Sequence, residues 1–391
     1  MPTEDSRPAR LKAVHLKNFL SFLDVSVQLD DLVVLVGANS TGKSNFVDAL
    51  RFIHEAVTIG LDAAITRRGG ISAVRRSTPG GRPPDVEVSY TVALSSSEVR
   101  YSIVIEAARG GDWNLKSETC EVFSLAGGWL SSYGRNATSL SFSGFSFETN
   151  ELVELMAASN ALVLPLFAAV EPFAEFYRFL GGISAYAIYP EALRRPQLPL
   201  PSYPLDEHGE NLTSVLKSMR DRKRQEADII RDALAAVVPR VVNYRVGSSG
   251  GYLSIAIAYL QEGKEAWFEA ARCSDGTLRL LGLLVALHQT PPRSLIAIEE
   301  PEQTVHPGAS AFICDEVVEA AHRSQVLITT HSPDIMSRMP IESLRVVEMT
   351  DRGSEIGPVA ADQMDAINRQ LFSAADVVRI EGLRRQVPAG D

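Results

Sequence analysis

The chain of 391 residues lacks the features that mark membrane and secreted proteins. No stretch approaches about 18 uncharged apolar residues, the length that a helix needs to span a bilayer. The first ten residues are polar and charged and contain no apolar signal-peptide core. Its three cysteines are widely spaced and form no metal-binding or disulfide pattern. We therefore expect a protein of the reducing cytoplasm, with no contact to a membrane.

Repeats, heptads and an excess of positive charge are missing as well. The formal net charge is −10, which argues against a protein coated by nucleic acid over much of its surface but leaves a local basic site open. Without heptads, a long coiled-coil arm is not expected. Hydrophobic residues make up 45% of the chain, so its length suits one large domain or a domain with an inserted lobe.

What the chain does contain is a phosphate-binding loop. Residues 37–44 read Gly-Ala-Asn-Ser-Thr-Gly-Lys-Ser and follow the apolar run 32–36, so a buried strand leads into a glycine-hinged loop and then a helix. Lys43 would reach the β- and γ-phosphates of ATP, and the Ser44 hydroxyl would bind Mg²⁺. The residues assigned to the nucleotide are Gly37, Asn39, Ser40, Thr41, Gly42, Lys43 and Ser44.

A second apolar strand, residues 294–298, ends in the acidic sequence Glu299-Glu300-Pro301-Glu302. A strand that ends in two adjacent carboxylates is a Walker B pattern. Glu299 would bind Mg²⁺ directly or through water, and Glu300 would orient or deprotonate the attacking water. The alternative is a solvated acidic loop after a core strand. The phosphate loop upstream favours the Walker B interpretation over this alternative.

Two further features have both a functional and a structural interpretation. Ser274 and Gly276 precede an apolar helix and could offer a hydroxyl and free N–H groups to an anion, or could form an ordinary helix N-cap. His331 follows the buried strand 325–330 and could donate a hydrogen bond to a γ-phosphate, or could be a structural histidine.

Along the chain the four elements follow the order phosphate loop, Ser274–Gly276 helix start, acidic strand and histidine strand, and together they resemble the ABC-type ATPase heads of the RecF-like and SMC-like (structural maintenance of chromosomes) branch. Three segments carry the detail of the resemblance: Leu-Lys-Asn-Phe-Leu-Ser-Phe at 16–22, Glu-Glu-Pro-Glu-Gln-Thr-Val-His-Pro at 299–307 and Thr-Thr-His-Ser-Pro-Asp at 329–334. The chain is similar to a large set of prokaryotic AAA-labelled predicted ATPases, related to the ATPase half of the OLD (overcoming lysogenisation defect) nucleases. The resemblance covers roughly residues 11–350.

The resemblance implies a homodimer in which two heads enclose two ATP molecules. Ser274 and Gly276 of one subunit would contact the γ-phosphate that Lys43 of the other subunit holds, and His306 would lie near the seam. The implied catalytic residues are Lys43, Glu300 and His331, and the implied Mg²⁺ ligands are Ser44 and Glu299. Two departures stand out: Glu299 replaces the usual aspartate, and Gln197 is only a weak candidate for the Q-loop glutamine.

The fold class implied is α/β, a P-loop NTPase head of ABC type with an antiparallel β lobe, an inserted helical segment and no long coiled coil. The expected organisation is a single head, 1–391. Its parts are a lobe with the phosphate loop and antiparallel strands (11–150), an inserted, mainly helical segment (151–237), a lobe with signature, Walker B and switch histidine (238–350) and C-terminal tail elements (351–391). Within it, we expect a surface loop or irregular hairpin at 127–150 and no regular structure at 190–204, which holds five prolines.

The function implied is an ATP-hydrolysing switch in DNA repair or anti-phage defence. Residues after His331 lack the carboxylate series of a Toprim nuclease, so a separately encoded effector such as a nuclease is expected. The alternatives are an ATP-gated scaffold with little hydrolysis and a transporter subunit, although the Ser-Asp-Gly-Thr signature is not the Ser-Gly-Gly-Gln of transporters. DNA is a candidate partner, because basic residues crowd the inserted segment: Lys217, Arg220, Arg222, Lys223, Arg224 and Arg231.

Those basic residues could equally form a solvated face balanced by neighbouring acids. The same choice applies to an arginine-rich connector after the phosphate-loop helix, of which one member could reach a nucleotide phosphate. The arginines concerned are Arg75, Arg76 and Arg82.

Overall fold

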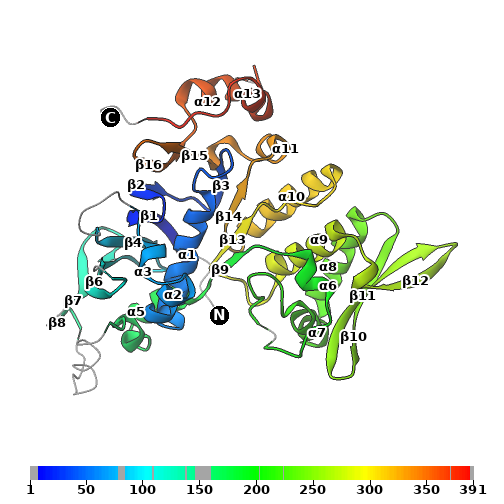
Figure 1. Ribbon diagram of the computed structural model, residues 1–391, viewed down its shortest axis with the longest axis horizontal. Coiled ribbons are helices and arrows are strands. Elements are labelled where there is room, and N and C mark those ends of the chain that lie inside the picture. Colours follow the sequence, from blue (N-terminus) through cyan, green and yellow to red (C-terminus); the bar gives the residue numbers. More distant parts are fainter. Residues whose placement is uncertain are drawn as a thin grey trace.

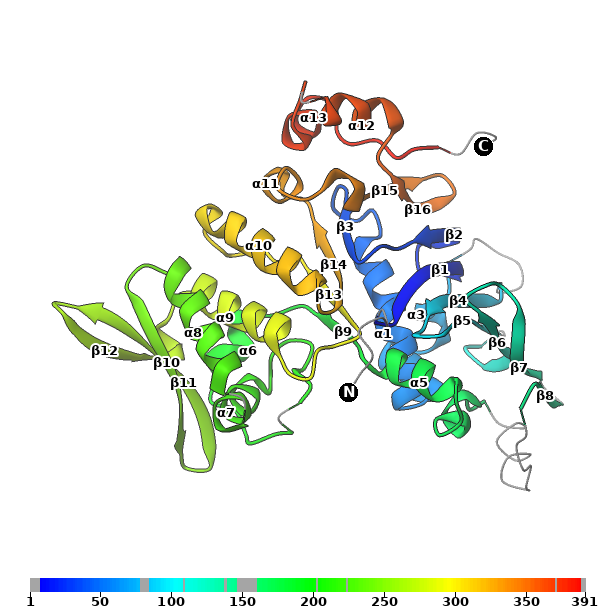
Figure 2. The same ribbon diagram turned by 180° about the vertical axis from the view of Figure 1, so that it is seen from behind.

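The computed structural model describes residues 8–77, 84–107, 110–136, 139–145, 160–201, 203–222, 224–369 and 371–387. These residues form three sheets, of seven, six and three strands. Figure 1 shows the seven-stranded sheet at one end, the six-stranded sheet in the middle and the three-stranded sheet at the other end. Helix α1 (Lys43–Thr58) lies between the first two sheets, and Figure 2 shows the same arrangement from behind.

The six-stranded sheet is parallel except for its edge strand β16. Its order is β16 (Gly353–Pro358), β15 (Leu344–Thr350), β3 (Leu32–Val36), β14 (Gln325–Thr330), β13 (Leu295–Glu299) and β9 (Ile183–Tyr186). Val33 and Leu35 point into the core shared with α1, whereas Val34 and Val36 point into the core on the opposite face. Burial on both faces explains why these strands read as continuous apolar runs. Because β3, β14 and β13 run parallel, their carboxyl ends meet at one edge of the sheet.

The seven-stranded sheet is antiparallel and covers the other side of α1. Its order is β2 (Phe22–Gln28), β1 (Arg10–Phe19), β4 (Val86–Ala93), β5 (Ser97–Ala107), β6 (Trp113–Ser124), β7 (Trp129–Asn136) and β8 (Leu140–Ser143). The hydroxyl of Tyr90 donates a hydrogen bond of 2.8 Å to the carbonyl oxygen of Ala49 in the middle of α1. The helix that follows the phosphate loop is thus held between two sheets.

Of the two structures expected at 127–150, a surface loop or an irregular hairpin, the structure shows a hairpin: β7 pairs antiparallel with β8 and joins the seven-stranded sheet through β6. The inward-facing residues of β7 are Ser131, Tyr133 and Arg135, each nearly inaccessible to solvent. Two of these three are polar or charged, so the period-two hydrophobic signal of a strand is absent from the sequence. Residues 137–138 and 146–150 of this segment lie outside the described residues.

A buried carboxylate, Glu118 of β6, ties this sheet to the segment that follows it. The hydroxyls of Tyr101 and Tyr133 each donate a hydrogen bond of 2.9 Å to Glu118. The backbone N–H groups of Val163 and Leu164 donate bonds of 2.6 and 3.0 Å. Burial raises the pKa of Glu118, while these four donors oppose the shift. The carboxylate therefore fixes residues 163–164 against the sheet.

We expect Glu118→Gln to lower the free energy of unfolding by about 2 kcal/mol, because the amide keeps the shape of the side chain but turns one acceptor into a donor facing donors. Urea unfolding measures the loss. Glu121→Gln, which changes an exposed carboxylate on the same strand, is the matched control, with an expected change below about 0.5 kcal/mol. Equal stability of the two variants would contradict the role assigned to Glu118.

The part of the chain that the structure describes contains further helices, several of which build the inserted segment. They are α2 (Leu61–Arg67), α3 (Ile71–Val74), α5 (Phe173–Gly181), α6 (Pro190–Arg194), α7 (Leu212–Arg222), α8 (Arg224–Val237), α9 (Asp275–His288), α10 (Ser310–Ala321), α11 (Pro333–Met336), α12 (Ala361–Asn368) and α13 (Ala374–Ile380). Helix α6 corrects the expectation that 190–204 lacks regular structure: Pro190 occupies the first helical turn, where its missing N–H costs nothing. Residues 151–159 of the expected helical segment lie outside the described residues.

The three-stranded sheet follows the inserted helices. Its strands are β10 (Val241–Ser249), β11 (Tyr252–Gln261) and β12 (Lys264–Glu269). Within the described residues the longest helix is α1, with 16 residues, so no long coiled-coil arm is present there. None of the helices in that part of the chain combines the length and apolar composition needed to cross a membrane.

Candidate functional site

The two glycines of the phosphate loop are required by close contacts as well as by backbone conformation. A Cβ atom on Gly37 would lie 2.3 Å from the carbonyl oxygen of Val347 in β15. Gly42 has φ 111°, and its Cβ would lie 2.3 Å from Oγ of Ser354 in β16. Strands β15 and β16 thus pack directly against the loop, which holds it in the curved shape that turns backbone N–H groups toward an anion.

Lys43 fills the centre of the loop. Its Nζ donates hydrogen bonds of 2.8 Å to the carbonyl oxygen of Gly37 and 2.7 Å to that of Ala38. Burial lowers the pKa of Lys43, and the nearby carboxylates of Glu300 and Glu302 oppose the shift. The ammonium group is therefore already inside the loop, within the field of the acidic residues at the next strand ends.

The outer face of the loop is polar and open to solvent. Asn39, Ser40 and Ser44 are exposed, and Ser40 has a left-handed backbone with φ 64°. Thr41 is buried instead, and its hydroxyl donates a bond of 3.0 Å to the Ala38 carbonyl oxygen, which fastens the loop to itself. The exposed hydroxyls and the N-terminus of α1 are the groups that a polyphosphate with its cation needs.

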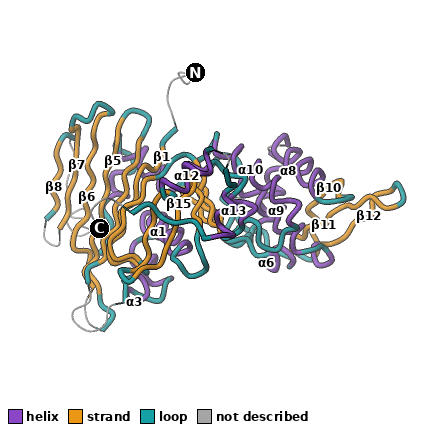
Figure 3. Tube along the Cα trace, turned by 90° about the horizontal axis from the view of Figure 1, so that it is seen from above, coloured by secondary structure: helices purple, strands orange, loops and turns teal. Residues whose placement is uncertain are grey.

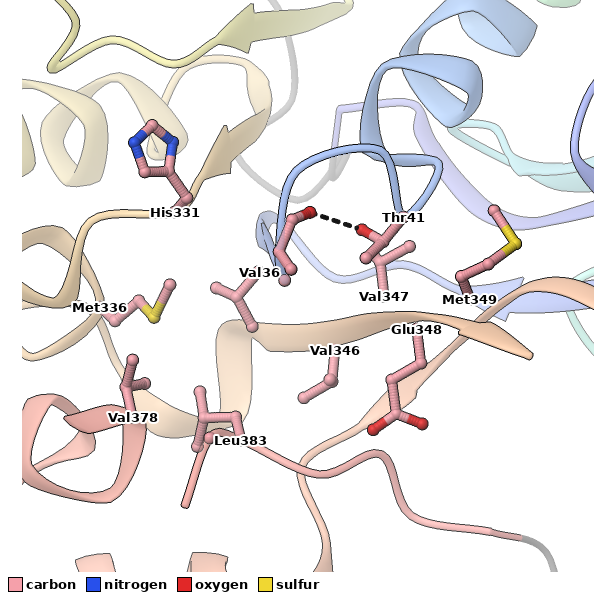
Figure 4. A pocket seen from close by; sticks show the side chains of 13 residues that line it. Val36, Thr41, His331, Met336, Val346, Val347, Glu348, Met349, Val378 and Leu383 are labelled. Atoms are coloured by element: carbon pink, nitrogen blue, oxygen red, sulfur yellow. Dashed lines mark hydrogen bonds between the residues drawn. The ribbon is translucent and has the colours of Figure 1, made fainter. Parts of the chain in front are cut away.

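The inner face of the loop borders a hollow of about 550 Å³, drawn in Figure 4. Gly37, Ala38 and Thr41 line one side of the hollow, and residues 346–349 of β15 line the other. Most of its side chains are apolar, among them Met336, Val346, Val378 and Leu383. Phosphates need N–H groups and cations rather than apolar walls, so most of this lining does not suit a polyphosphate, although His331 also lines the hollow.

The acidic residues predicted from the sequence lie at the carboxyl end of β13, next to the end of β14. Glu300 has a left-handed backbone with φ 44°, and its N–H donates a bond of 3.0 Å to the carbonyl oxygen of Thr329. Its Oε1 lies 3.3 Å from Nδ1 of His331. A non-glycine residue in this conformation is strained, and such strain gathers at functional sites. The fold therefore brings the expected catalytic carboxylate and the expected switch histidine into contact.

Glu299 makes a different contact from its neighbour. Its Oε1 lies 3.4 Å from Nη2 of Arg51 on α1. The same Nη2 lies 2.8 Å from Oε1 of Glu207, which belongs to the inserted segment. The carbonyl oxygen of Glu207 also accepts a bond of 3.0 Å from the N–H of Ala187, just past the end of β9. Arg51 therefore joins the expected Mg²⁺ ligand to the inserted segment through a shared ion pair.

The donor set fits a magnesium ion bound together with phosphate. Ser44 supplies an exposed hydroxyl at the start of α1, and Glu299 supplies a carboxylate at the end of a neighbouring strand. Oε2 of Glu302 is buried without a hydrogen-bond partner among the described residues, while its Oε1 accepts a bond of 2.5 Å from Thr330. Within these residues no group of three or more His, Cys, Asp or Glu side chains could hold a metal.

Arg279 is a site residue that sequence reasoning missed. It is buried in the middle of the apolar helix α9, and its Nη2 donates bonds of 3.2 and 2.8 Å to the carbonyl oxygens of Glu299 and Glu300. Its Nη1 donates a bond of 2.6 Å to the carbonyl oxygen of Ile188. This guanidinium therefore holds the backbone of the acidic pair in place. A single arginine within the run Leu278–Leu287 was the available signal.

Ser274 and Gly276 line a separate hollow of about 900 Å³. Ser274 is the N-cap of α9 and accepts a bond of 3.2 Å from the N–H of Thr277, which is the structural interpretation of this residue. A Cβ on Gly276 would lie 2.8 Å from the carbonyl oxygen of Thr304, so glycine is needed there. His306 lines the same hollow. Neither Lys43 nor any residue of the phosphate loop lines it.

The other predicted residues have varied surroundings. Gln197 is buried in the inserted segment, where its amide bonds to backbone groups and to the hydroxyl of Thr213. Arg76 lies beside the turn between β1 and β2. Its backbone N–H donates a hydrogen bond of 2.7 Å to the carbonyl oxygen of Asn18. Its neighbour Arg75 pairs with Phe19 in an isolated bridge. Two predicted basic residues, Arg82 and Lys223, lie outside the described residues.

Comparison with known proteins places this geometry in a family. The family model described as "AAA domain, putative AbiEii toxin, Type IV TA system" matches residues 32–337, the larger part of the chain. No curated protein matches the chain.

Two solved structures are similar in fold. An Smc head bound to the C-winged helix domain of ScpA has a TM-score of 0.56 at 15% identity, covering 91% of this chain and 99% of that one. An Smc head domain with an extended coiled coil, bound to the C-terminal domain of ScpA and derived from Pyrococcus furiosus, has a TM-score of 0.52 at 15% identity, covering 93% and 99%. At this identity the likeness concerns the fold alone.

Proposed function

The chain belongs to the AAA-domain family that its residues 32–337 match and has the fold of an ABC-type, RecF/SMC-like ATPase head; from this premise we propose that it is an ATP-hydrolysing switch that works as a homodimer. The observation that carries the proposal is the contact of 3.3 Å between Glu300 and His331, beside the loop that holds Lys43. A carboxylate and an imidazole paired at adjoining strand ends are the groups needed to handle an attacking water and a γ-phosphate.

The proposed reaction begins when Lys43 leaves the loop carbonyls for the β- and γ-phosphates. Ser44 and Glu299 would hold the magnesium ion, whose charge offsets that of the phosphates, and Arg51 would then keep Glu207 as its partner. Glu300 would accept a proton from the attacking water, and its left-handed backbone would fix where the carboxylate lies.

His331 and Arg279 have supporting parts in this proposal. His331 would donate a hydrogen bond to the γ-phosphate and would sense its loss, because it contacts Glu300 on its other side. Arg279 would keep the acidic pair in register with the signature helix, since its guanidinium bonds to the backbone of both acids from α9. Turnover in one site would thereby be connected to α9, the helix that Ser274 caps.

The homodimer is supported by the separation, within one chain, of two parts of the proposed site: the phosphate loop and the Ser274–Gly276 helix start. Ser274 and Gly276 line a hollow that no residue of the phosphate loop lines, so within one chain they have no phosphate to contact. A second copy would supply the nucleotide, with the N-terminus of α9 facing the γ-phosphate. Dimerisation would therefore depend on bound ATP, and hydrolysis would release it.

For the biological role, we propose DNA repair or anti-phage defence in the cytoplasm, with a separately encoded effector such as a nuclease and with DNA as a candidate ligand. The family description supports a role in defence, since it refers to a toxin–antitoxin system. An ATP-gated scaffold with little hydrolysis is the alternative, and the intact pair of Glu299 and Glu300 favours hydrolysis over it.

Release of phosphate from Mg²⁺-ATP by the purified full chain tests this function. We expect measurable turnover that falls about 10²-fold in Lys43→Ala, because removal of a preorganised phosphate clamp has effects of this size. Lys264→Ala, which changes an exposed lysine on β12, is the control and should leave turnover unchanged. Turnover that survives in Lys43→Ala would point to a contaminating ATPase, and its absence from the wild type would favour the scaffold.

A further inference from the structure

A cleft separate from the two hollows described above lies between the inserted helices α7 and α8 and the strands β10 and β12. Its volume is about 590 Å³. Its walls carry four arginines and the indole of Trp267, against two aspartates: Arg220, Arg224, Arg231 and Arg245. Figure 3 shows β10, β11 and β12 projecting beyond α8, at the opposite end of the molecule from the seven-stranded sheet. No residue of the phosphate loop or of the signature lines this cleft.

The charge of the cleft is opposite to that of the whole chain. Arg220 is paired with Asp221 at 3.2 Å, and Arg231 is paired with Asp228 at 2.6 Å and with Asp232 at 2.8 Å, yet the two arginine side chains remain 50% and 34% exposed. Neither of the other two arginines makes an ion pair within the described part of the chain. In a chain of net charge −10, a concave site with a surplus of guanidinium groups marks a place for an anionic ligand, and guanidinium forks match phosphate oxygens.

The cleft also offers a flat stacking surface. The guanidinium of Arg245 lies 4.3 Å from the centroid of the Trp267 ring. The ladder places the two on one face of the sheet, because Ala256 of β11 pairs with Arg245 and Ala258 of β11 pairs with Trp267. The small alanine side chains leave room for Arg245 to reach across the central strand. A planar pair of this kind stacks on a nucleic-acid base, by ring contact or through the guanidinium plane.

We propose that this cleft binds a single strand of nucleic acid, with phosphates on the arginines of α7 and α8 and a base against Arg245 and Trp267. A duplex fits the cleft poorly, because the faces of its bases are covered by their neighbours and cannot reach a recessed indole. In a single strand the bases are free to turn out. The concave shape and the ring therefore select for one strand, whereas the arginines alone would not.

Both walls of the cleft lead to the hollow that Ser274 and Gly276 line, called the signature hollow below. Helix α8 carries Arg224 and Arg231 and ends at Val237, which lines the signature hollow. Strand β12 carries Trp267 and is followed by a short helical turn, residues 270–272, that leads to Ser274. A strand bound in the cleft would therefore change ATP turnover. Only this coupling rests on the proposed function, because strand binding itself needs neither ATP nor a dimer.

The first test is the affinity of the full chain for a labelled 20-nucleotide poly(dT), measured by fluorescence anisotropy without ATP. We expect the double variant Arg224→Ala/Arg245→Ala to bind at least about tenfold more weakly. Its slope of log affinity against log salt should be shallower by about 0.7 for each phosphate that the variant can no longer neutralise. Arg222→Ala changes an exposed arginine on α7 outside the cleft and is the matched control, with wild-type affinity expected.

The second test uses Trp267 as a reporter. In the background Trp113→Phe/Trp129→Phe it is the only tryptophan of the chain, and saturating poly(dT) should quench its emission. A duplex of the same length should bind more weakly and leave the emission unchanged. Thermal unfolding checks that each variant is folded. Equal affinity of the double variant and Arg222→Ala, unchanged Trp267 emission, or tighter binding of the duplex would each overturn the proposal.

A third measurement separates this proposal from the proposed ATPase. Poly(dT) should raise phosphate release by the wild type severalfold and leave that of Arg224→Ala/Arg245→Ala unchanged. Strand binding that persists in Lys43→Ala, or in a preparation with no turnover, supports the cleft independently of the ATPase. Normal turnover without any strand binding overturns the cleft and leaves the ATPase standing. An unchanged rate at saturating poly(dT) overturns the coupling.

Discussion

Glu300→Gln is expected to lower phosphate release by about 10²- to 10⁴-fold while ATP binding is retained, so that the variant collects as an ATP-bound dimer. Glutamine keeps the length of the side chain and can still contact His331, which lies 3.3 Å from the carboxylate. It cannot take a proton from water at neutral pH. Because neither Lys43 nor Ser44 is changed, we expect the nucleotide to remain bound. Without hydrolysis, the ATP-bound dimer would not dissociate.

Two measurements check this expectation. Single-turnover phosphate release gives the loss of chemistry, and light scattering after gel filtration in Mg²⁺-ATP gives the dimer. Glu319→Gln changes an exposed carboxylate on α10 that pairs only with Arg323 among the described residues, so it serves as the control and should behave as wild type. Full turnover in Glu300→Gln would show that another group handles the attacking water.

The phosphate loop could be predicted from the sequence because its requirements are local. Gly37 and Gly42 meet the backbone of β15 and the side chain of Ser354 so closely that no other residue fits, and this need appears in the sequence as two glycines at fixed spacing. The parallel strands were predictable for a similar reason, since burial on both faces leaves uninterrupted apolar runs. The fold class predicted from these motifs is confirmed by the family match and by the likeness to Smc heads.

The rest of the site depends on contacts between distant segments, and no local pattern encodes them. Arg51 joins Glu299 to Glu207 across about 250 and 150 positions of sequence, and each of the three looks like an ordinary surface charge when taken alone. The sequence left a loop and a hairpin open for the segment that contains β7, because the buried face of this strand is formed by Ser131, Tyr133 and Arg135. Tertiary burial of polar groups hides the periodicity that sequence reasoning needs.

If the site is shared between two subunits as proposed, a second large effect is expected when two inactive variants are mixed. Lys43→Ala removes the phosphate clamp, and Ser274→Arg places a bulky cation where the signature hydroxyl would meet the partner's γ-phosphate. Each variant alone is expected to be inactive. In an equal mixture about half of the dimers pair one variant with the other, and in each of these one of the two sites takes its loop and its signature from unaltered halves. We therefore expect about a quarter of wild-type turnover to return.

A mixture of Lys43→Ala with Glu300→Gln separates this explanation from general rescue by mixing. Both changes lie in the half-site that holds the phosphate loop, so every site in the mixed dimer carries one defect and no activity should return. Phosphate release after mixing and re-equilibration in ATP measures both cases, and thermal unfolding confirms that Ser274→Arg folds despite the loss of an N-cap worth about 1 kcal/mol. Recovery in both mixtures, or in neither, would contradict a site shared between two subunits. Recovery only with Ser274→Arg would support the proposed shared site, in which the hollow around Ser274, which no phosphate-loop residue of its own chain lines, receives the loop of a second copy.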